Sequence, residues 1–217
     1  MNVLHICANP KTTEESASKQ LATSFFAKLV EINPDIDITN VDLYHENPPF
    51  LDADAIRGAW FPVYIDGYTT TSEEKAALSY ADAQAEIFNQ ADVVVLTMPM
   101  WNYSVPAILK AWLDQVMVPN RTFSMSKDGG IKPLHRVKKL VMLVASGGVY
   151  KEYDPRDALT SMVENLFGWI GIDDCSIAWA DGQDVFLFED GSDRQAVAFE
   201  AAQELAEDVA GMALPAL

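Results

Sequence analysis

Alternation between short apolar runs and helical patterns constrains this chain more than any other feature. The apolar runs are rich in Val, Ile and Leu, as buried or half-buried strands are, and they lie at 2–8, 36–43, 92–98, 139–145 and 174–180. Segments with the periodicity of a helix separate them, at 15–31, 73–90, 107–118 and 157–170. Strand followed by helix throughout predicts an α/β fold, a doubly wound five-stranded parallel sheet with helices on both faces.

The C-terminal part of the chain is acidic and has a helical period. Residues 185–217 carry seven acids and one base, Arg194. An apolar stripe recurs there at every fourth position: Val197, Ala201, Leu205 and Val209. The pattern predicts an amphipathic helix with a solvated acidic face. The formal net charge of −17 also argues against nucleic-acid binding, which relies on Lys and Arg to neutralise phosphates.

Length and apolar content favour a single compact unit. With 217 residues the chain can bury a full core, and we expect 1–217 to form one domain. No window approaches the ~20 continuous apolar residues of a membrane span, and the N-terminus lacks the features of a secretion signal. Cys7 and Cys175 fall in predicted strands, where buried thiols in a reducing cytoplasm are expected rather than a disulfide.

Two stretches, 44–72 and 118–136, have no regular pattern, and we expect them to be long loops. The first is rich in Pro, Trp and Tyr, and the second contains a Gly129-Gly130 turn. Long loops in compact domains are often functional. In an open α/β sheet the ligand crevice lies beyond the carboxyl ends of the strands. The segments that follow Ala8, Met98 and Ala145 are therefore the expected site.

The first of these segments reads "ANPKTTEESASKQL". Ser16 and Ser18 lie at the mouth of the first helix, with Lys11 upstream. Unpaired N–H groups at a helix N-terminus, together with serine hydroxyls, can bind a phosphate. Helix capping by a serine is the alternative interpretation. The segment has neither a Walker motif nor a G-x-G-x-x-G motif, so it supports neither a nucleoside triphosphatase nor a Rossmann dinucleotide site.

The second segment, "MPMWNYSVP", leaves a buried strand and enters a helix directly. Pro99 is expected to end the strand, and Ser104 with Pro106 to cap and begin the helix. The backbone N–H groups of 100–103 and the Asn102 amide could bind the polar edge of a planar heterocycle. Apolar side chains would cover its face. Alternatively, the two aromatic residues simply pack under the neighbouring helix.

The third segment, "ASGGVY", contains adjacent glycines that let the backbone approach a ligand closely. Backbone donors placed there could stabilise negative charge that develops on a ring. A plain tight turn is the alternative.

Together, and in this order, the segments resemble the flavodoxin-like FMN-dependent NAD(P)H oxidoreductases, in particular the azoreductase and quinone-reductase branch. "SASKQL" resembles the Ser-x-Ser-x-x-Leu phosphate loop of that family, and "SGGVY" its Gly-Gly turn at the pyrimidine edge. "PMWNYSVPAILKAWLDQV" resembles the Pro-Met-Tyr-Asn-Phe signature over the flavin, with Trp101 and Tyr103 in place of its Tyr and Phe. "TFSMSKDGGIKPL" is similar to the loop that supplies an aromatic residue near the ring, here Phe123.

The resemblance implies a cytoplasmic homodimer with non-covalently bound FMN, in which the partner completes each flavin pocket. NADH or NADPH would reduce the FMN, which would pass two electrons to a quinone or azo compound by a ping-pong mechanism at one stacking site. The implied cofactor-binding residues are Asn9, Ser16, Ser18, Pro99, Met100, Trp101, Asn102, Tyr103, Ser146, Gly147 and Gly148. The implied walls of the substrate space are Trp60, Phe123 and Tyr150. No catalytic side chain is required, because the flavin carries the chemistry.

Other classes of function remain as alternatives at this stage. A flavodoxin-like electron carrier would not oxidise NAD(P)H directly, and a non-enzymatic FMN-binding protein would take up flavin without turnover. A hydrolase is opposed by the absence of a G-x-S-x-G motif and by the scatter of His5, His45 and His135. No cluster in the sequence has the spacing of a metal site.

Overall fold

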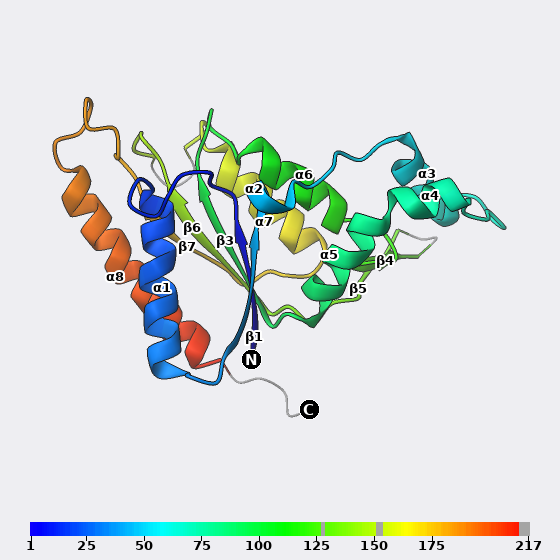
Figure 1. Ribbon diagram of the computed structural model, residues 1–217, viewed down its shortest axis with the longest axis horizontal. Helices are drawn as coiled ribbons and strands as arrows, with labels where there is room; N and C mark the ends of the chain where they lie inside the picture. The colour runs from blue at the N-terminus through cyan, green and yellow to red at the C-terminus, as the bar shows by residue number, and fades with distance from the viewer. Residues whose placement is uncertain (127–128, 151–153, 213–217) are drawn as a thin grey trace.

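A five-stranded parallel sheet forms the centre of the protein in the computed structural model, which describes residues 1–126, 129–150 and 154–212. The strand order is β2-β1-β3-β6-β7 (Figure 1). The strands are β1 (Asn2–Cys7), β2 (Asp37–Asp42), β3 (Val93–Pro99), β6 (Lys139–Ala145) and β7 (Cys175–Ala180). The predicted doubly wound parallel sheet is confirmed, and the predicted strand positions agree with these bounds to within one or two residues.

The central strands are buried because helices cover both faces of the sheet. All residues of β3 except Pro99, and all of β6 except Ala145, are buried, which explains why both read as continuous apolar runs. Strand β2 lies at the edge and is largely exposed. Pro99 pairs with Ala145, and Cys7 pairs with Thr97. The chain therefore leaves β1, β3 and β6 at the same edge of the sheet.

Helices α1 (Ala17–Ile32) and α8 (Gly191–Ala210) lie together on one face (Figure 1). Leu21, Phe25 and Leu29 of α1 recur at every fourth position and are fully buried, whereas Ile32 at the end of the helix is 45% exposed. The stripe predicted for α8 is correct at Val209, which is fully buried, and wrong at Val197, which is 67% exposed. Ala201 and Leu205 are only partly buried, and the most buried residues lie one position further along. The buried row consists of Ala198, Ala202, Ala206 and Val209. Small side chains let α8 pack closely on α1, while the acidic face is exposed as expected.

The opposite face carries α5 (Ser79–Gln90), α6 (Ala107–Val116) and α7 (Ala158–Trp169). The single helix predicted over 73–90 is instead two helices, α4 (Ser72–Ala77) and α5, separated at Leu78. Helix α4 begins at Thr71, whose hydroxyl accepts a hydrogen bond from the Glu74 N–H, while the Glu74 carboxylate accepts one from the Thr71 N–H.

The two stretches expected to be loops contain regular structure. Stretch 44–72 contains most of α2 (Leu43–Glu46) and all of α3 (Ala53–Tyr64), which includes Pro62 near its C-terminal end. Stretch 118–136 forms the antiparallel pair β4 (Phe123–Met125) and β5 (Ile131–Pro133). These elements were not predicted, because the prolines and glycines in both stretches usually interrupt regular structure.

The two cysteines are free thiols, Cys7 buried and Cys175 half-buried. The pKa of Cys175 is raised to about 11, mainly because the thiol is partly buried. Across the described ranges, no helix is both long enough and apolar enough to cross a membrane. The same ranges contain no group of three or more His, Cys, Asp and Glu side chains that could hold a metal ion.

Candidate functional site

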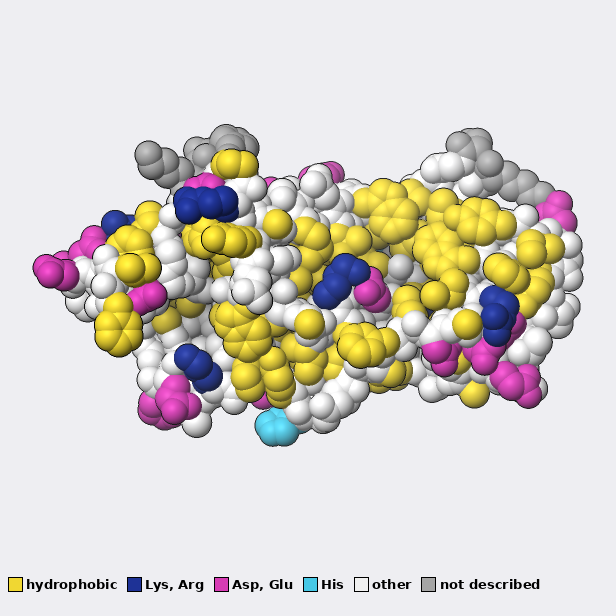
Figure 2. Space-filling model, turned by 90° about the horizontal axis from the view of Figure 1, so that it is seen from above, with side chains coloured by type: hydrophobic (Ala, Val, Ile, Leu, Met, Phe, Trp, Pro, Cys, Tyr) yellow, Lys and Arg dark blue, Asp and Glu magenta, His cyan; other side chains and the backbone are white. Residues whose placement is uncertain are grey.

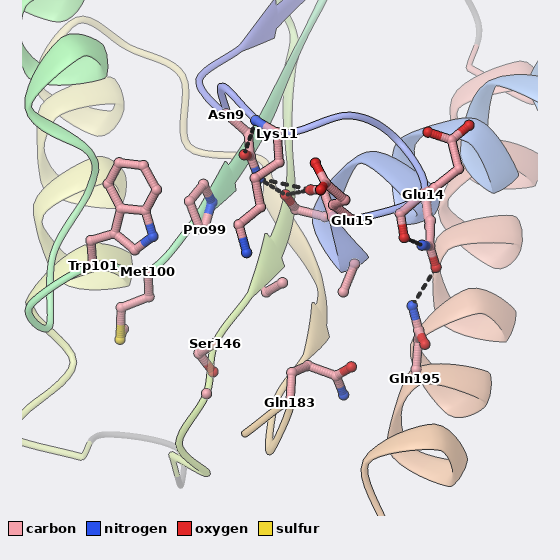
Figure 3. A pocket seen from close by; sticks show the side chains of 16 residues that line it. Asn9, Lys11, Glu14, Glu15, Pro99, Met100, Trp101, Ser146, Gln183 and Gln195 are labelled. Atoms are coloured by element: carbon pink, nitrogen blue, oxygen red, sulfur yellow. Dashed lines mark hydrogen bonds between the residues drawn. The ribbon is translucent and has the colours of Figure 1, made fainter. Parts of the chain in front are cut away.

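A cavity of about 400 Å³ opens at the edge of the sheet where β1, β3 and β6 end (Figure 3). All three segments expected from the sequence contribute to its lining. The predicted cofactor-binding residues in this lining are Asn9, Ser16, Ser18, Pro99, Met100, Trp101, Ser146 and Gly147. The fold therefore brings together residues that are up to 138 positions apart in sequence (147 minus 9).

At one end of the cavity, a buried amide holds two serine hydroxyls at the start of α1. The Asn9 Nδ2 donates to Ser16 Oγ at 2.7 Å and to Ser18 Oγ at 3.1 Å. Asn9 Oδ1 accepts from the Lys11 N–H, which closes the loop on itself. Since both N–H bonds of Asn9 are used here, its amide positions the serines instead of donating to a ligand.

Ser16 is also the N-cap of α1, since its Oγ accepts from the Lys19 N–H at 3.1 Å. Capping and anion binding are compatible, because the oxygen accepts while hydroxyl hydrogens remain. Only one of the two serine hydroxyls can donate across the 3.2 Å between Ser16 Oγ and Ser18 Oγ. The N–H groups of Ala17 and Ser18 have no partner among the described residues. Together these donors form an anion-binding helix N-terminus.

The charged side chains that line the cavity are Lys11, Glu14 and Glu15. Figure 3 shows Lys11 extending into the cavity from the loop between β1 and α1. Glu15 instead accepts hydrogen bonds from the Thr12 N–H and hydroxyl, both at 3.3 Å. Lys11 is therefore the lining residue that can offset the charge of a bound anion.

At the other end, a tight turn displays two aromatic side chains. Trp101 and Ser104 exchange backbone hydrogen bonds of 3.0 and 3.1 Å, and Asn102 and Tyr103 between them have positive φ angles of 50° and 67°. Left-handed backbone costs roughly 1–3 kcal/mol for a residue other than glycine, and such strain often marks functional sites. Trp101 is 40% exposed and Tyr103 52% exposed. The turn, rather than packing under a helix, places these rings at the surface.

Two details predicted for this turn are wrong. The N–H groups of Met100 and Trp101 do not face a ligand, because they donate to the backbone oxygens of Ala145 and Ser104. Ser104 does not cap the following helix, because it pairs with Trp101, and the N-cap is Pro106 without a side-chain hydrogen bond. The N–H groups of Asn102 and Tyr103 have no partner among the described residues and are the free donors of this turn.

The turn after β6 is held by the loop between β7 and α8. Three carbonyl groups of the turn, those of Ser146, Gly147 and Gly148, accept hydrogen bonds from consecutive N–H groups of residues 182–184 at 3.0–3.2 Å. The Ser146 hydroxyl donates to the Gly148 carbonyl and accepts from the Trp179 indole N–H, each at 2.8 Å. Ser146 therefore uses the hydrogen of its hydroxyl within the protein, and its expected role in cofactor binding stays a prediction.

Several predicted site residues do not line this cavity. Among the cofactor-binding predictions these are Asn102, Tyr103 and Gly148, and among the substrate walls Trp60, Phe123 and Tyr150. Phe123 is fully buried against Trp169, with 4.5 Å between ring centroids. Trp60 stacks on Tyr64 in α3, and Tyr150 stacks on Trp179.

Gln183 and Gln195 also line the cavity, although they lie outside the three segments that the sequence analysis predicted. Gln195 on α8, labelled in Figure 3, donates to Gln20 on α1 at 2.8 Å. Gln20 in turn donates to the carbonyls of Thr13 and Glu14. These amide hydrogen bonds connect the loop between β1 and α1 to α8. Glutamine in an acidic helix carries no local signal for such a role, because the contact depends on how the two helices pack.

A larger groove of about 720 Å³ lies between α1 and β2. His5 lies in this groove with Phe26 at 4.6 Å between ring centroids, and hydrogen-bonds to Asn40 and Thr97. Burial lowers the pKa of His5 to about 4, so the ring is neutral. Neither the turn after β3 nor the turn after β6 lines this groove. The smaller cavity is therefore the better candidate, because it lies beyond the carboxyl ends of the strands.

Comparison with known proteins identifies the relatives of this chain. A family model described as "Flavodoxin-like fold" matches residues 1–208. FMN-dependent NADH:quinone oxidoreductase 1 from Bacillus licheniformis is 35% identical over 175 residues, 79% of this chain and 82% of that protein. FMN-dependent NADH:quinone oxidoreductase from Gluconobacter oxydans is 32% identical over 207 residues, 94% and 98% of the two chains. The crystal structure of azoreductase AzrA superposes with a TM-score of 0.85 at 28% identity, over 96% of this chain and all of that one.

Proposed function

This chain belongs to the family with the flavodoxin-like fold that matches residues 1–208, and on that basis we propose how its cavity works. The protein is an FMN-dependent oxidoreductase that takes electrons from NADH and passes them to quinones or azo compounds. Relatives of at least 32% identity that align over most of the chain carry the NADH:quinone activity in their names. The azoreductase structure adds the azo acceptor.

The observation that carries the assignment is the pair of donor sets in one cavity. At one end, the free N–H groups of Ala17 and Ser18 and the serine hydroxyls fit a phosphate. At the other end, Trp101 and the turn after β6 fit a flat ring with polar edges. FMN has a phosphate at one end and such a ring at the other, so the residues present fit this cofactor. Asn9 and Ser146 support the site through their hydrogen bonds to neighbouring groups.

Bound FMN supplies an electron acceptor that NADH can reduce and that a quinone can re-oxidise. The role of the protein is to bind the cofactor and orient it. The α1 N-terminus and Lys11 would hold the phosphate, and Trp101 would cover the ring and exclude water from it. The N–H groups of Gly147 and Gly148 would point at the edge where negative charge develops. Because a single cavity serves donor and acceptor, we infer that they occupy it in turn, which is a ping-pong order.

No side chain is needed as an essential acid or base. The titratable groups of the lining are Lys11, Glu14 and Glu15, all exposed, so solvent reaches them. Water can therefore supply the protons that a quinone takes up. This proposal predicts that no single substitution among these three abolishes turnover.

We infer that the protein is a homodimer in which a second copy covers this edge. Figure 2 shows hydrophobic side chains gathered over the half of the edge where α3 and α6 lie. Trp101, Tyr103 and Tyr64 are 40%, 52% and 66% exposed, which is a large apolar surface for a monomer. Trp60 and Tyr150, which are only partly buried, would then contribute to the pocket of the partner, whereas Phe123 is fully buried in its own chain. Light scattering at several concentrations tests the dimer.

We also propose that 1–217 forms one domain and that the protein works in the cytoplasm. Its last five residues and 127–128 and 151–153 lie outside the described residues. Two free thiols, one of them buried, fit a reducing compartment.

The test uses the purified protein and its colour. Flavin absorbance is measured after reconstitution with FMN, NADH is added without oxygen, and a quinone follows. The proposal predicts bleaching by NADH and recovery of absorbance with one equivalent of quinone. Protein that takes up no FMN refutes the assignment. Uptake without bleaching favours a flavodoxin-like carrier or a non-enzymatic flavin protein instead.

A further inference from the structure

One tryptophan outside the cavity is connected to it by two short hydrogen bonds. Trp179 lies on β7, and its indole N–H donates to Ser146 Oγ at 2.8 Å. The Ser146 hydroxyl donates in turn to the carbonyl oxygen of Gly148 at 2.8 Å. Ser146 is 5% exposed, so neither bond competes strongly with water.

The indole is itself fixed by its neighbours. Its ring stacks on Tyr150 with 5.8 Å between centroids and 25° between planes. Tyr150 contacts the Tyr103 ring edge-on, at 6.4 Å and 84°. The Arg156 guanidinium lies over the Tyr150 ring, 5.3 Å from its centroid. A rigid aromatic cluster therefore holds the donor that reaches Ser146.

The consequence concerns the direction of the N–H groups in the turn. A trans peptide points its N–H opposite to its C=O. The carbonyls of Ser146 and Gly147 accept from the N–H groups of Gln183 and Asp184, so the N–H groups of Gly147 and Gly148 point away from that loop. Both N–H groups lack a partner among the described residues. Neither glycine has a positive φ, so hydrogen bonds rather than a glycine-only conformation set this turn.

We propose that Trp179 is a positioning residue, whose indole N–H, through the Ser146 hydroxyl, locks the Gly147–Gly148 turn. The free N–H groups of this turn are thereby held away from the loop between β7 and α8, and Gly147 lines the cavity. This inference rests on the proposed function, because those N–H groups would meet the edge of the flavin ring. Donors held in place stabilise the more negative, reduced cofactor more than the oxidised one. Trp179 therefore raises the affinity for reduced cofactor and, with it, the reduction potential.

The test compares Trp179→Phe with Trp112→Phe. Phenylalanine at 179 keeps an aromatic ring against Tyr150 and removes the N–H donor together with part of the bulk of the indole, a loss of bulk that Trp112→Phe shares. Trp112 is fully buried and donates to Gln84 at 2.8 Å, so its replacement removes a bond of the same type and length elsewhere. We expect Trp179→Phe to weaken the binding of reduced FMN about tenfold relative to oxidised FMN. That change lowers the two-electron potential by about 30 mV. Trp112→Phe should lower the thermal stability and leave the potential unchanged.

Ser146→Ala provides the second variant and removes the same relay at its centre. It should lower the potential as Trp179→Phe does, and the double variant should lower it no further. Equal potentials for all variants, or equal shifts for both tryptophan variants, overturn the proposal.

A readout without cofactor separates this inference from the proposed function. In the apoprotein, hydrogen exchange of the peptide that contains 146–150 should speed up in Trp179→Phe and not in Trp112→Phe. Unchanged exchange overturns the positioning role. If wild-type protein binds no FMN but the exchange still speeds up, the relay stands and the proposed function fails.

Discussion

Replacing Ser18 by alanine separates the binding of a phosphate from the stability of the fold. Ser18 is fully buried, and its Oγ accepts one hydrogen bond from Asn9 at 3.1 Å. The other N–H of Asn9 keeps its shorter bond to Ser16, at 2.7 Å. Ser18 Oγ also lies 3.2 Å from Ser16 Oγ, so the fold loses two neutral hydrogen bonds, about 1–2 kcal/mol in all.

A bound phosphate would lose a hydrogen bond to a charged group, which contributes about 1.5–3 kcal/mol. At 1.4 kcal/mol for each factor of ten, the Kd for FMN should rise about 10- to 100-fold. Titration of the apoprotein with FMN, followed by quenching of flavin fluorescence, measures this change. Riboflavin is the matched ligand, because it lacks the phosphate, and its Kd should stay the same in Ser18→Ala and wild type.

Ser16→Ala is the contrasting variant. It removes the N-cap of α1 as well as a hydroxyl, and it should lower the free energy of unfolding by about 1 kcal/mol in addition to weakening FMN. An unchanged Kd for FMN in Ser18→Ala, or an equal loss of FMN and riboflavin binding, refutes a phosphate site at the start of α1.

Three further predictions concern charge and buried polar groups. Lys11→Met should weaken FMN binding about three- to fivefold at low ionic strength and less at high salt, because salt screens the ammonium–phosphate attraction; equal losses at both salt concentrations contradict it. Tyr80 has a buried hydroxyl without a partner among the described residues, and burial followed by the Glu46 charge raises its pKa to about 12. Tyr80→Phe should therefore leave the free energy of unfolding in urea unchanged or raise it by about 1 kcal/mol, and a clear loss refutes the account. Burial lowers the pKa of His5 to about 4, so the folded state excludes a proton that the unfolded chain accepts below about 6.5. The free energy of unfolding should therefore fall by up to about 1.4 kcal/mol per pH unit as the pH is lowered from about 6.5 to about 4. His5→Gln should flatten this pH dependence, and identical slopes in the variant and the wild type contradict the prediction.

The sheet and the position of the candidate cavity could be predicted because both depend on local patterns. The runs that became β3 and β6 are apolar at almost every residue, and only a parallel sheet covered on both faces buries such strands. The order of elements then fixes which loops meet at the carboxyl edge. Ser16 and Ser18 were identifiable because a helix start restricts which residues occur there.

The remaining features depend on contacts between distant elements. Helix α3 was missed because Pro62 and the aromatic residues suggested a loop, whereas Asp52 caps a helix that buries Ala55, Gly58 and Ala59. The alanine face of α8 depends on its packing against α1. The bond between Trp179 and Ser146 spans 33 positions (179 minus 146) and has no local signature.

The prediction of which backbone N–H groups are free to bind a ligand was also partly wrong. Met100 and Trp101 were expected to offer their N–H groups, but the bonds to Ala145 and Ser104 use them. A sequence states how many donors a segment has, and only the fold decides which of them stay free.

The most direct measurement is a crystal structure of the protein with FMN. We predict phosphate oxygens within hydrogen-bond distance of Ser18 Oγ and of the N–H groups of Ala17 and Ser18, with the ring between Trp101 and the Gly147–Gly148 turn. FMN bound instead in the groove between α1 and β2, beside His5 and Phe26, would contradict the account.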